Sequence, residues 1–278
     1  MNKKNFNNIY NEIKLCKDEV DYGVDELAYY LEVGIKAVNL AKSIFNKGFG
    51  DKTRLYKDTH GANIDYATES DRIIEREIKK LLADTNLEIL GEEYGGESSN
   101  KGYCWVIDPI DGTLNYANEL PFASISLSLA YNGNPIIGII STPKLNDNLY
   151  FGIENIGAWK NYEKINTIQR DFKEVVIAYD GVRGDMEDIY INKIKKEFGR
   201  VRLLGTTATE LALCAEGGFG AVFSPMAEFW DVAGGIAIVK GAGGVVCNID
   251  GNEALPGSGS IIAGCRDNVH KIIDAINK

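Results

Sequence analysis

The sequence predicts a layered α/β fold. Helix-like and strand-like segments alternate along most of its 278 residues, and the strand-like segments are short and bounded by turn residues. No fixed-period repeat or low-complexity tract is visible, so nothing supports a solenoid. A chain of this length forms one large domain or two closely packed ones, and it can bury a sizeable core.

Two helices separated by a loop are expected before residue 87. Apolar residues recur at nearly helical spacing over Val24–Asn46 and predict a long amphipathic helix there. Residues 1–23 form an extra N-terminal segment before it. The stretch Lys47–Asp65 mixes glycines with charged residues and has little periodicity, which predicts a mobile loop. A capping-type start at Thr68 predicts a second helix that runs to about Ala83.

The middle of the chain is expected to be rich in strands. Small polar and apolar side chains alternate after Phe122, as in a strand that is buried on one face. The strand-like runs are Leu87–Leu90, Tyr103–Ile107, Phe122–Tyr131, Ile136–Thr142 and Leu149–Gly152.

After Asn161 strand and helix patterns alternate. The segments are Val175–Tyr179, Met186–Phe198, Val201–Leu204, Thr206–Glu216, Ala221–Phe223, Asp231–Lys240, Gly244–Cys247, Ser260–Ala263 and Asp267–Ile276. The sequence therefore predicts an N-terminal extension (1–23), an α+β half (24–160) and an α/β half (161–278).

The composition limits the class of protein. Hydrophobic residues make up 45% and charged residues 25% of the chain, which argues against disorder. The formal net charge is -10 and the sequence pI is about 4.9, so nucleic acid is disfavoured as a nonspecific partner. Small anionic substrates stay possible, because clustered carboxylates can hold divalent cations and present positive charge locally.

Location and redox state follow from what the sequence lacks. No apolar run is long enough to span a bilayer, and the N-terminus lacks the apolar core of a signal peptide, so we expect a cytoplasmic protein. The five cysteines are scattered and form no C-x-x-C pair, which predicts reduced, mostly buried thiols. The two histidines lie far apart, so the chemistry is expected to depend on carboxylates.

The segment WVIDPIDGT, residues 105–113, is the most informative part of the chain. An apolar strand is expected to end at Asp108, Pro109 to stop further pairing, and Asp111 to begin a turn into a helix. Two carboxylates on such a turn can converge on hard cations, while the Gly112 and Thr113 amides can hold a phosphate. A solvated Asp-Pro turn is the alternative, and the flanking strand and Gly-Thr pair favour the cation site.

Two further acids belong to this pattern. Glu92 lies in the GEE segment after a predicted strand, where a solvent-exposed strand end is the plain alternative. Asp231 lies in the WDVAGG segment at a predicted helix start, where a helix-capping role is the plain alternative.

Taken together in this order and spacing, the GEE, WVIDPIDGT and WDVAGG segments resemble the inositol monophosphatase-like family of metal-dependent sugar phosphatases, which includes inositol monophosphatases and archaeal-type fructose-1,6-bisphosphatases. The similarity covers about residues 24–276. It implies an αβαβα layered sandwich with mixed sheets, an active site between the two halves, a homodimer, and hydrolysis of phosphate monoesters with Mg²⁺.

The resemblance also implies residue roles. Glu92, Asp108 and the Ile110 carbonyl would hold one metal ion, and Asp108, Asp111 and Asp231 a second. Glu92 would also contribute to a weaker third site. Four carboxylates and a phosphate monoester together carry about six negative charges, which two or three Mg²⁺ ions roughly neutralise.

Catalysis would then proceed by metal-activated water without a covalent nucleophile. The resemblance implies that Asp71 pairs with the Thr113 hydroxyl to orient this water, whereas helix capping is an equally good account of Asp71 from the sequence alone. It also implies that the Gly112 and Thr113 amides receive the phosphate.

Substrate contacts are expected from Gly205, Thr206 and Thr207, although a strand-to-helix turn with a threonine cap explains these residues equally well. Ser224 departs from the family pattern, because inositol phosphatases characteristically place a carboxylate there to bind inositol hydroxyls. Neither inositol monophosphate nor fructose bisphosphate is therefore secured as the substrate.

Three functions stay open. The first is a Mg²⁺-dependent phosphatase of inositol monophosphate, fructose 1,6-bisphosphate or a similar polyol phosphate. The second is a nucleotide-type phosphatase that acts on phosphoadenosine phosphate. The third is an interaction protein of the same fold, associated with RNA polymerase or the ribosome, which the negative charge disfavours.

Overall fold

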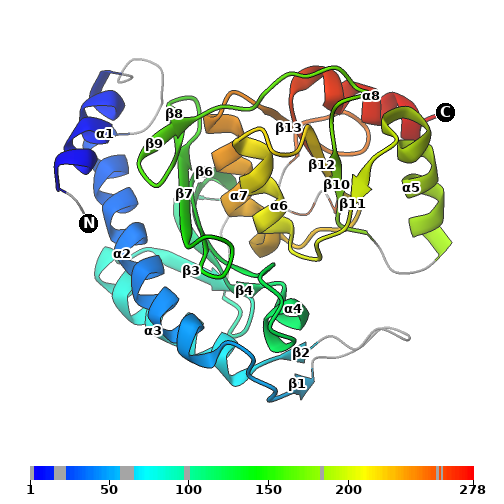
Figure 1. Cartoon of the computed structure of the whole chain (residues 1–278). Coiled ribbons are helices and arrows are strands. Elements are labelled where there is room, and N and C mark those ends of the chain that lie inside the picture. The colour runs from blue at the N-terminus through cyan, green and yellow to red at the C-terminus, as the bar shows by residue number, and fades with distance from the viewer. Residues whose placement is uncertain are drawn as a thin grey trace.

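The computed structural model describes residues 3–15, 23–56, 66–96, 101–181, 185–254, 257 and 259–278. Its elements form five layers, which confirms the predicted αβαβα sandwich (Figure 1). The helical layers are α1 (Lys3–Leu15), α2 (Val24–Gly48) and α3 (Glu69–Leu82) on one outside, α6 (Thr207–Ala215) and α7 (Phe229–Gly241) in the middle, and α5 (Asp185–Phe198) and α8 (Arg266–Ile276) on the other outside.

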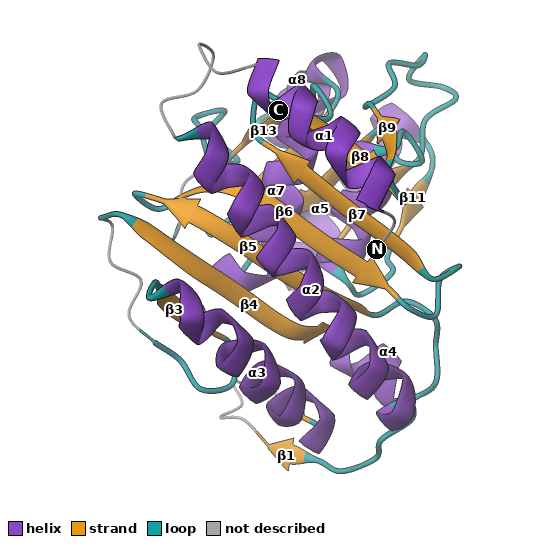
Figure 2. Ribbon diagram, turned by 90° about the vertical axis from the view of Figure 1, so that its left-hand side faces the viewer, coloured by secondary structure: helices purple, strands orange, loops and turns teal. Residues whose placement is uncertain are grey.

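Between the outer and middle helices lies a seven-stranded sheet whose strands follow one another in chain order. Its strands are β3 (Glu88–Gly91), β4 (Tyr103–Asp111), β5 (Ser124–Tyr131), β6 (Asn134–Thr142), β7 (Asn148–Ile153), β8 (Gly157–Lys160) and β9 (Glu163–Ile165). β3 and β4 are parallel, and every later pair is antiparallel. Figure 2 shows α2 and α3 lying across one face of this sheet.

The second sheet has five strands in the order β11-β10-β12-β14-β13. They are β10 (Ile177–Tyr179), β11 (Val201–Arg202), β12 (Ala221–Ser224), β13 (Val245–Cys247) and β14 (Ile261–Gly264). β10 is parallel to both of its neighbours, whereas β14 is antiparallel to β12 and β13. Both sheets are therefore mixed.

The middle layer is built around α7, which is apolar and buried over nearly its whole length. Its backbone approaches the first sheet so closely that a Cβ on Gly138 of β6 would lie 1.9 Å from the Gly234 carbonyl oxygen. Glycine at these positions lets the helix rest on the sheet, and this contact fixes where the first turn of α7 lies.

β4 differs from the sequence-based expectation. The strand was expected to end at Asp108, but it continues through Pro109 to Asp111, and its pairing with β5 shifts register between Asp108 and Asp111. Proline is tolerated there because the irregular register does not require its missing N–H. Both acids therefore sit on the strand, on either side of the irregularity.

The segment predicted as a loop over Lys47–Asp65 is anchored where it is described. β1 (Leu55–Tyr56) pairs with β2 (Tyr66–Ala67), and Asp51 accepts a hydrogen bond from the Ser70 hydroxyl at 3.1 Å. The rest of the predicted loop, residues 57–65, lies outside the described residues.

α1 gives the N-terminal segment a structure that the sequence did not predict. Ile9 and Ile13 are buried against the core, and the Tyr10 hydroxyl donates to Asp25 of α2 at 2.8 Å. The short helix α4 (Thr113–Ala117) begins where the turn after Asp111 was expected to lead into a helix, whereas β8, β9 and the short helix η1 (Ala83–Thr85) lay outside the expected segments.

Two chemical expectations can be compared with the described part of the chain. Cys104, Cys214, Cys247 and Cys265 are free, buried thiols, as predicted, and Cys16 lies outside the described residues. Among the described helices, none has the length and apolar content that crossing a membrane requires.

Candidate active site

The parallel pairing of β3 and β4 brings Glu92 next to Asp108. Gly91 lies opposite Ile107, and the Glu92 amide donates to the Ile107 carbonyl at 3.2 Å. The negative charge of Glu92 contributes to a raised pKa of Asp108, as expected for neighbouring carboxylates. The structure thus brings together two acids that the sequence separates by a strand.

Glu75 of α3 positions the turn that carries Glu92. Its carboxylate is fully buried and accepts backbone hydrogen bonds from Glu93 at 2.7 Å and Tyr94 at 3.2 Å. Lys79 pairs with the same carboxylate at 2.9 Å. The sequence analysis missed this role, because Glu75 reads as an ordinary polar residue of an amphipathic helix.

Asp108 is almost completely buried. Its side chain is 1% exposed, and its Oδ1 atom has no hydrogen-bond partner among the described residues. Burial raises the pKa of Asp108 most, followed by the negative charges of Glu92, Asp111 and Asp231. A buried carboxylate oxygen without a donor is a costly arrangement that a cation would relieve.

Asp111 is held against the N-terminus of α6. Its Oδ1 accepts the Thr207 amide at 3.1 Å, and its Oδ2 accepts the Ala208 amide at 2.9 Å and the Ser124 hydroxyl at 3.1 Å. The Thr206 hydroxyl donates to the same Oδ2. Burial nevertheless outweighs these donors and raises the pKa of Asp111 to about 7.

Asp231 reaches the same acids from the first turn of α7. Burial raises its pKa, and the charges of Asp111 and Glu92 raise it further. The predicted helix-start position of Asp231 is confirmed, since α7 begins two residues earlier at Phe229. Asp231 and the first-sheet acids therefore share one electrostatic environment.

Asp71, in the first turn of α3, contacts Thr113 at the start of α4. The Thr113 hydroxyl lies 3.2 Å from Oδ1 of Asp71 and 3.0 Å from the Ile110 carbonyl oxygen. Asp71 also caps α3, because its Oδ2 accepts from the Thr68 amide at 2.8 Å. The structure thus contains both the Thr113 contact and the helix-capping contact of Asp71. Burial raises the pKa of Asp71 to about 7.

Gly112 allows the turn after β4 to lie against the turn before α6. Its φ is +83°, and a Cβ there would come within 2.9 Å of the Phe122 carbonyl oxygen and 3.1 Å of the Gly205 carbonyl oxygen. Only glycine adopts this backbone and leaves this space. The predicted phosphate segment at Gly112 and Thr113 therefore adjoins the predicted substrate segment at Gly205 and Thr206.

Asp180, at the end of β10, is a further acid of this region that the sequence analysis missed. The Thr207 hydroxyl donates to its Oδ2, and its charge contributes to the raised pKa of Asp111 and of Asp231. Asp180 belongs to no motif, and it lies 67 positions after Thr113, the nearest predicted site residue before it, so only the fold reveals it.

The donor set fits a hard cation in charge and chemistry. Oxygen ligands from several carboxylates suit Mg²⁺, and the negative charges of these acids raise one another's pKa. Within the described residues, no three His, Cys, Asp or Glu side chains lie close enough together to hold a metal ion as they stand. Both carboxylate oxygens of Asp111 instead accept backbone hydrogen bonds from α6. A small rotation of Asp111 would be part of metal binding.

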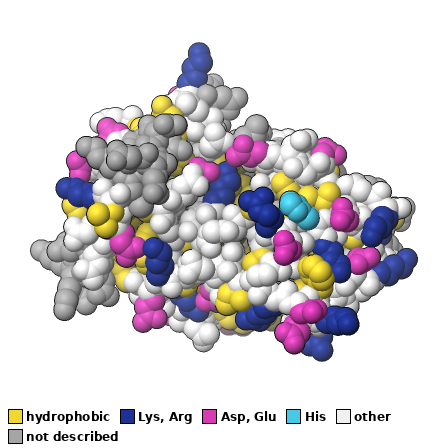
Figure 3. All heavy atoms as spheres, turned by 90° about the horizontal axis from the view of Figure 1, so that it is seen from above, with side chains coloured by type: hydrophobic (Ala, Val, Ile, Leu, Met, Phe, Trp, Pro, Cys, Tyr) yellow, Lys and Arg dark blue, Asp and Glu magenta, His cyan; other side chains and the backbone are white. Residues whose placement is uncertain are grey.

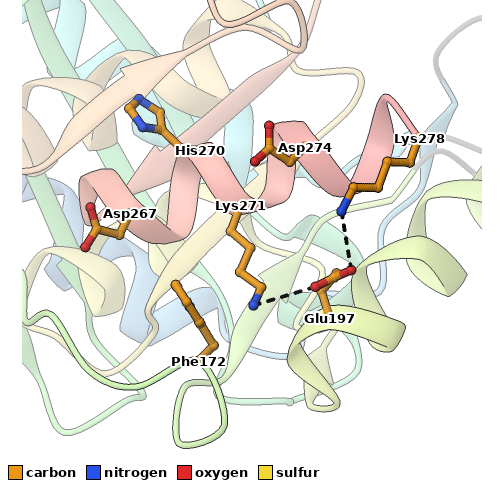
Figure 4. A pocket seen from close by; sticks show the side chains of 7 residues that line it. All are labelled: Phe172, Glu197, Asp267, His270, Lys271, Asp274 and Lys278. Atoms are coloured by element: carbon orange, nitrogen blue, oxygen red, sulfur yellow. Dashed lines mark ion pairs between the residues drawn. The ribbon is translucent and has the colours of Figure 1, made fainter.

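Other surface features lack this concentration of one charge. A pocket between α5 and α8 has both Lys271 and Lys278 near Glu197, at 3.6 and 3.8 Å, so its charges largely offset one another (Figure 4). Figure 3 shows positive and negative side chains interspersed on the face seen from above. Neither feature resembles an extended anion-binding surface.

Comparison with known proteins agrees with this geometry. The family model described as "Inositol monophosphatase family" matches residues 26–278. The chain belongs to the inositol monophosphatase family. The resemblance drawn from the GEE, WVIDPIDGT and WDVAGG segments is thereby confirmed.

Three relatives illustrate the family. A "probable inositol 1-monophosphatase" from Mycobacterium tuberculosis is 33% identical over 210 residues, which cover 72% of this chain and 77% of the relative. A "fructose-1,6-bisphosphatase/inositol-1-monophosphatase" from Aquifex aeolicus is 32% identical over 234 residues, covering 80% and 86%. The crystal structure of the "extragenic suppressor protein suhB" from Bartonella henselae superposes with a TM-score of 0.82 at 26% identity, covering 90% and 99%.

Proposed function

We propose that this chain is a Mg²⁺-dependent phosphatase of small phosphate monoesters, with inositol monophosphate and fructose 1,6-bisphosphate as first substrates to test. The observation that carries the proposal is the buried Asp108, whose partnerless Oδ1 lies among acids from two strands and a helix. Membership of the inositol monophosphatase family and the printed names of two relatives support the phosphatase activity.

The proposed ligands of two or three Mg²⁺ ions are Glu92, Asp108, the Ile110 carbonyl, Asp111 and Asp231. When bound, Mg²⁺ supplies Lewis-acid stabilisation of the negative charge that develops on the phosphate and on the leaving oxygen. The residues themselves supply five oxygen-bearing groups in a water-poor site, where electrostatic interactions are strong. Glu75 supports this arrangement by fixing the turn of Glu92.

Thr113 and Asp71 are proposed to handle the proton of the attacking water. The Thr113 hydroxyl can accept a hydrogen bond from water while it donates to Asp71 Oδ1. As the water oxygen attacks phosphorus and the P–O ester bond breaks, Thr113 passes its proton to Asp71 and takes one from the water. The pKa of about 7 makes Asp71 a suitable proton acceptor near neutral pH.

Substrate orientation is proposed to depend on the two adjoining turns. The Gly112 and Thr113 amides would bind the phosphate oxygens, and Gly205, Thr206 and Thr207 would contact the alcohol part of the substrate. The close approach of Gly112 to the Gly205 carbonyl supports this shared site. The leaving alkoxide takes a proton from solvent water and Asp71 later releases its proton to solvent, so the products are inorganic phosphate and the free alcohol.

A second candidate function is favoured by the similarity to the suhB-named structure. In this alternative the chain acts as an interaction protein and its acids are dispensable. We further propose a cytoplasmic homodimer, for which the four buried free thiols support the location and the family resemblance supports the dimer.

A substrate panel tests the proposed function. Purified protein is assayed with inositol 1-phosphate, fructose 1,6-bisphosphate, phosphoadenosine phosphate and p-nitrophenyl phosphate, with Mg²⁺ or with EDTA. Mg²⁺-dependent release of phosphate from a polyol phosphate supports the proposal. Preference for phosphoadenosine phosphate supports the nucleotide-type alternative, and absence of turnover with every ester supports the interaction protein.

A further inference from the structure

A second polar cluster adjoins the acid site on the second sheet. β10 and β12 run parallel, with Tyr179 opposite Phe223, and the Asp180 amide donates to the Phe223 carbonyl at 3.0 Å. Asp180 and Ser224 therefore end neighbouring strands at the same edge of the sheet. This edge lies beside the N-terminus of α6, since Asp180 accepts the Thr207 hydroxyl.

Strand alternation places both side chains on the face that carries α6. Ala178 and Val222 belong to the core between the two sheets, whereas Tyr179 and Phe223 belong to the core under α5 and α8. Two positions after Ala178 and Val222, Asp180 and Ser224 return to the face of the middle layer. Both therefore point toward the side on which Asp111 and Asp231 lie.

Ser224 provides independent evidence that a hydrogen-bond partner is missing at this place. It is fully buried, and its Oγ has no hydrogen-bond partner among the described residues. A buried hydroxyl in this state costs free energy unless a ligand or a water completes it. Its position beside Asp180 marks where a polar group of a ligand would be accommodated.

We propose that Asp180 is a specificity-determining residue whose carboxylate, together with the Ser224 hydroxyl, binds the hydroxyl groups of a polyol phosphate. The inference rests on the proposed phosphatase function and names the part of the site that recognises the alcohol.

The chemistry of the cluster matches vicinal hydroxyls. A carboxylate accepts about four hydrogen bonds through its two oxygens, and that of Asp180 accepts one from the Thr207 hydroxyl. A serine hydroxyl can both donate and accept, and a polyol offers both kinds of group. An aryl phosphate offers neither, so Asp180 should contribute to binding of polyol esters selectively.

Asp180→Asn tests the proposal, because the amide oxygen can still accept from Thr207 while the charge is lost. Values of kcat and KM are measured for inositol 1-phosphate, fructose 1,6-bisphosphate and p-nitrophenyl phosphate. The kcat/KM ratio of each polyol ester to the aryl ester is expected to fall about 10- to 100-fold, mainly through KM. Asp274→Asn on the exposed side of α8 is the matched control and should leave the ratios unchanged.

A second variant separates binding from a structural role. Adding Ser224→Glu to Asp180→Asn restores a carboxylate on the neighbouring strand, and it should recover part of the lost ratio for at least one polyol ester if the double variant keeps a native circular dichroism spectrum.

Several results would overturn the proposal. They are an equal loss of kcat/KM for the aryl and polyol esters, or an unchanged ratio. If the wild type hydrolyses only the aryl ester, the phosphatase function stands and this proposal fails. If the wild type hydrolyses no ester with Mg²⁺, the proposed function fails first and the specificity role fails with it.

Discussion

The Thr113 hydroxyl lies 3.2 Å from Oδ1 of Asp71, a residue 42 positions earlier in the chain. This contact joins the start of α3 to the turn after β4. Asp71 is fully buried, and its other oxygen binds the Thr68 amide and hydroxyl that begin α3. The Asp71 carboxylate therefore both caps α3 and contacts a hydroxyl of the site. A shift of the start of α3 would also move the proposed water position.

Asp71→Asn is expected to lower kcat about 100-fold with little change in KM, because the amide cannot take the proton that Thr113 would pass on. Steady-state kinetics with inositol 1-phosphate measure this change. Thr113→Ser keeps the hydroxyl and should retain most activity, whereas Thr113→Val should resemble Asp71→Asn. A rise in KM without a fall in kcat would show that Asp71 acts only in substrate binding.

The metal-free protein should lose stability as the pH rises. The folded pKa values of Asp71 and Asp111 are about 7, well above the ordinary 3.8 of an aspartate, so folding binds protons. Their contribution is fully present below about pH 4 and is lost as the pH rises through 7. In EDTA, the melting temperature is therefore expected to fall between pH 5.5 and pH 8.

Asp108→Asn provides the control for this pH dependence. The variant removes one buried charge from the group, so its melting temperature should fall less over the same range. A wild-type melting temperature that is flat or rises from pH 5.5 to pH 8 in EDTA would contradict the mutual repulsion of these acids.

Mg²⁺ should stabilise the folded chain. A ligand at about 100 times its dissociation constant adds about 2.7 kcal/mol, which corresponds to a rise of several degrees in melting temperature for a chain of this size. The shift is measured by differential scanning fluorimetry at pH 8, with KCl of equal ionic strength as the control. An equal shift with KCl alone would mean that screening, and not a site, is responsible.

Selectivity among polyol phosphates should be broad. Ser224 lacks the carboxylate typical of inositol phosphatases, and one missing acceptor reduces discrimination by about 1 to 3 kcal/mol. The kcat/KM values for inositol monophosphate, fructose bisphosphate and glycerol phosphate are therefore expected within about two orders of magnitude of one another. Ser224→Glu should shift preference toward inositol monophosphate, and a natural preference of four or more orders would contradict this account.

Local patterns were enough to predict most of the fold. The helices around Ile35 and Ile74 and most strands of both sheets follow from apolar spacing and turn residues. The continuation of β4 through Pro109 was not predictable, because it depends on an irregular register with β5. β8 and β9 were missed because strands of four and three residues with glycine or charged residues carry a weak pattern.

Only those site residues that lie in sequence motifs could be predicted. Glu92, Asp108, Asp111 and Asp231 lie in three segments with a family signature, and the structure brings them into one electrostatic group. Asp111 accepts hydrogen bonds from the α6 amides of Thr207 and Ala208, which lie 96 and 97 residues later in the chain. These contacts depend on tertiary packing. The same is true of Asp180, which no motif contains.

The central claim is that Asp108 belongs to a cation-dependent phosphatase site. Its most direct test is the activity of Asp108→Asn with Mg²⁺ on the best substrate of the wild type. We predict a native circular dichroism spectrum and a loss of kcat/KM of about 1,000-fold or more, because the variant removes the carboxylate proposed to bridge two ions. A folded Asp108→Asn variant with Mg²⁺-dependent turnover within tenfold of the wild type would contradict the account.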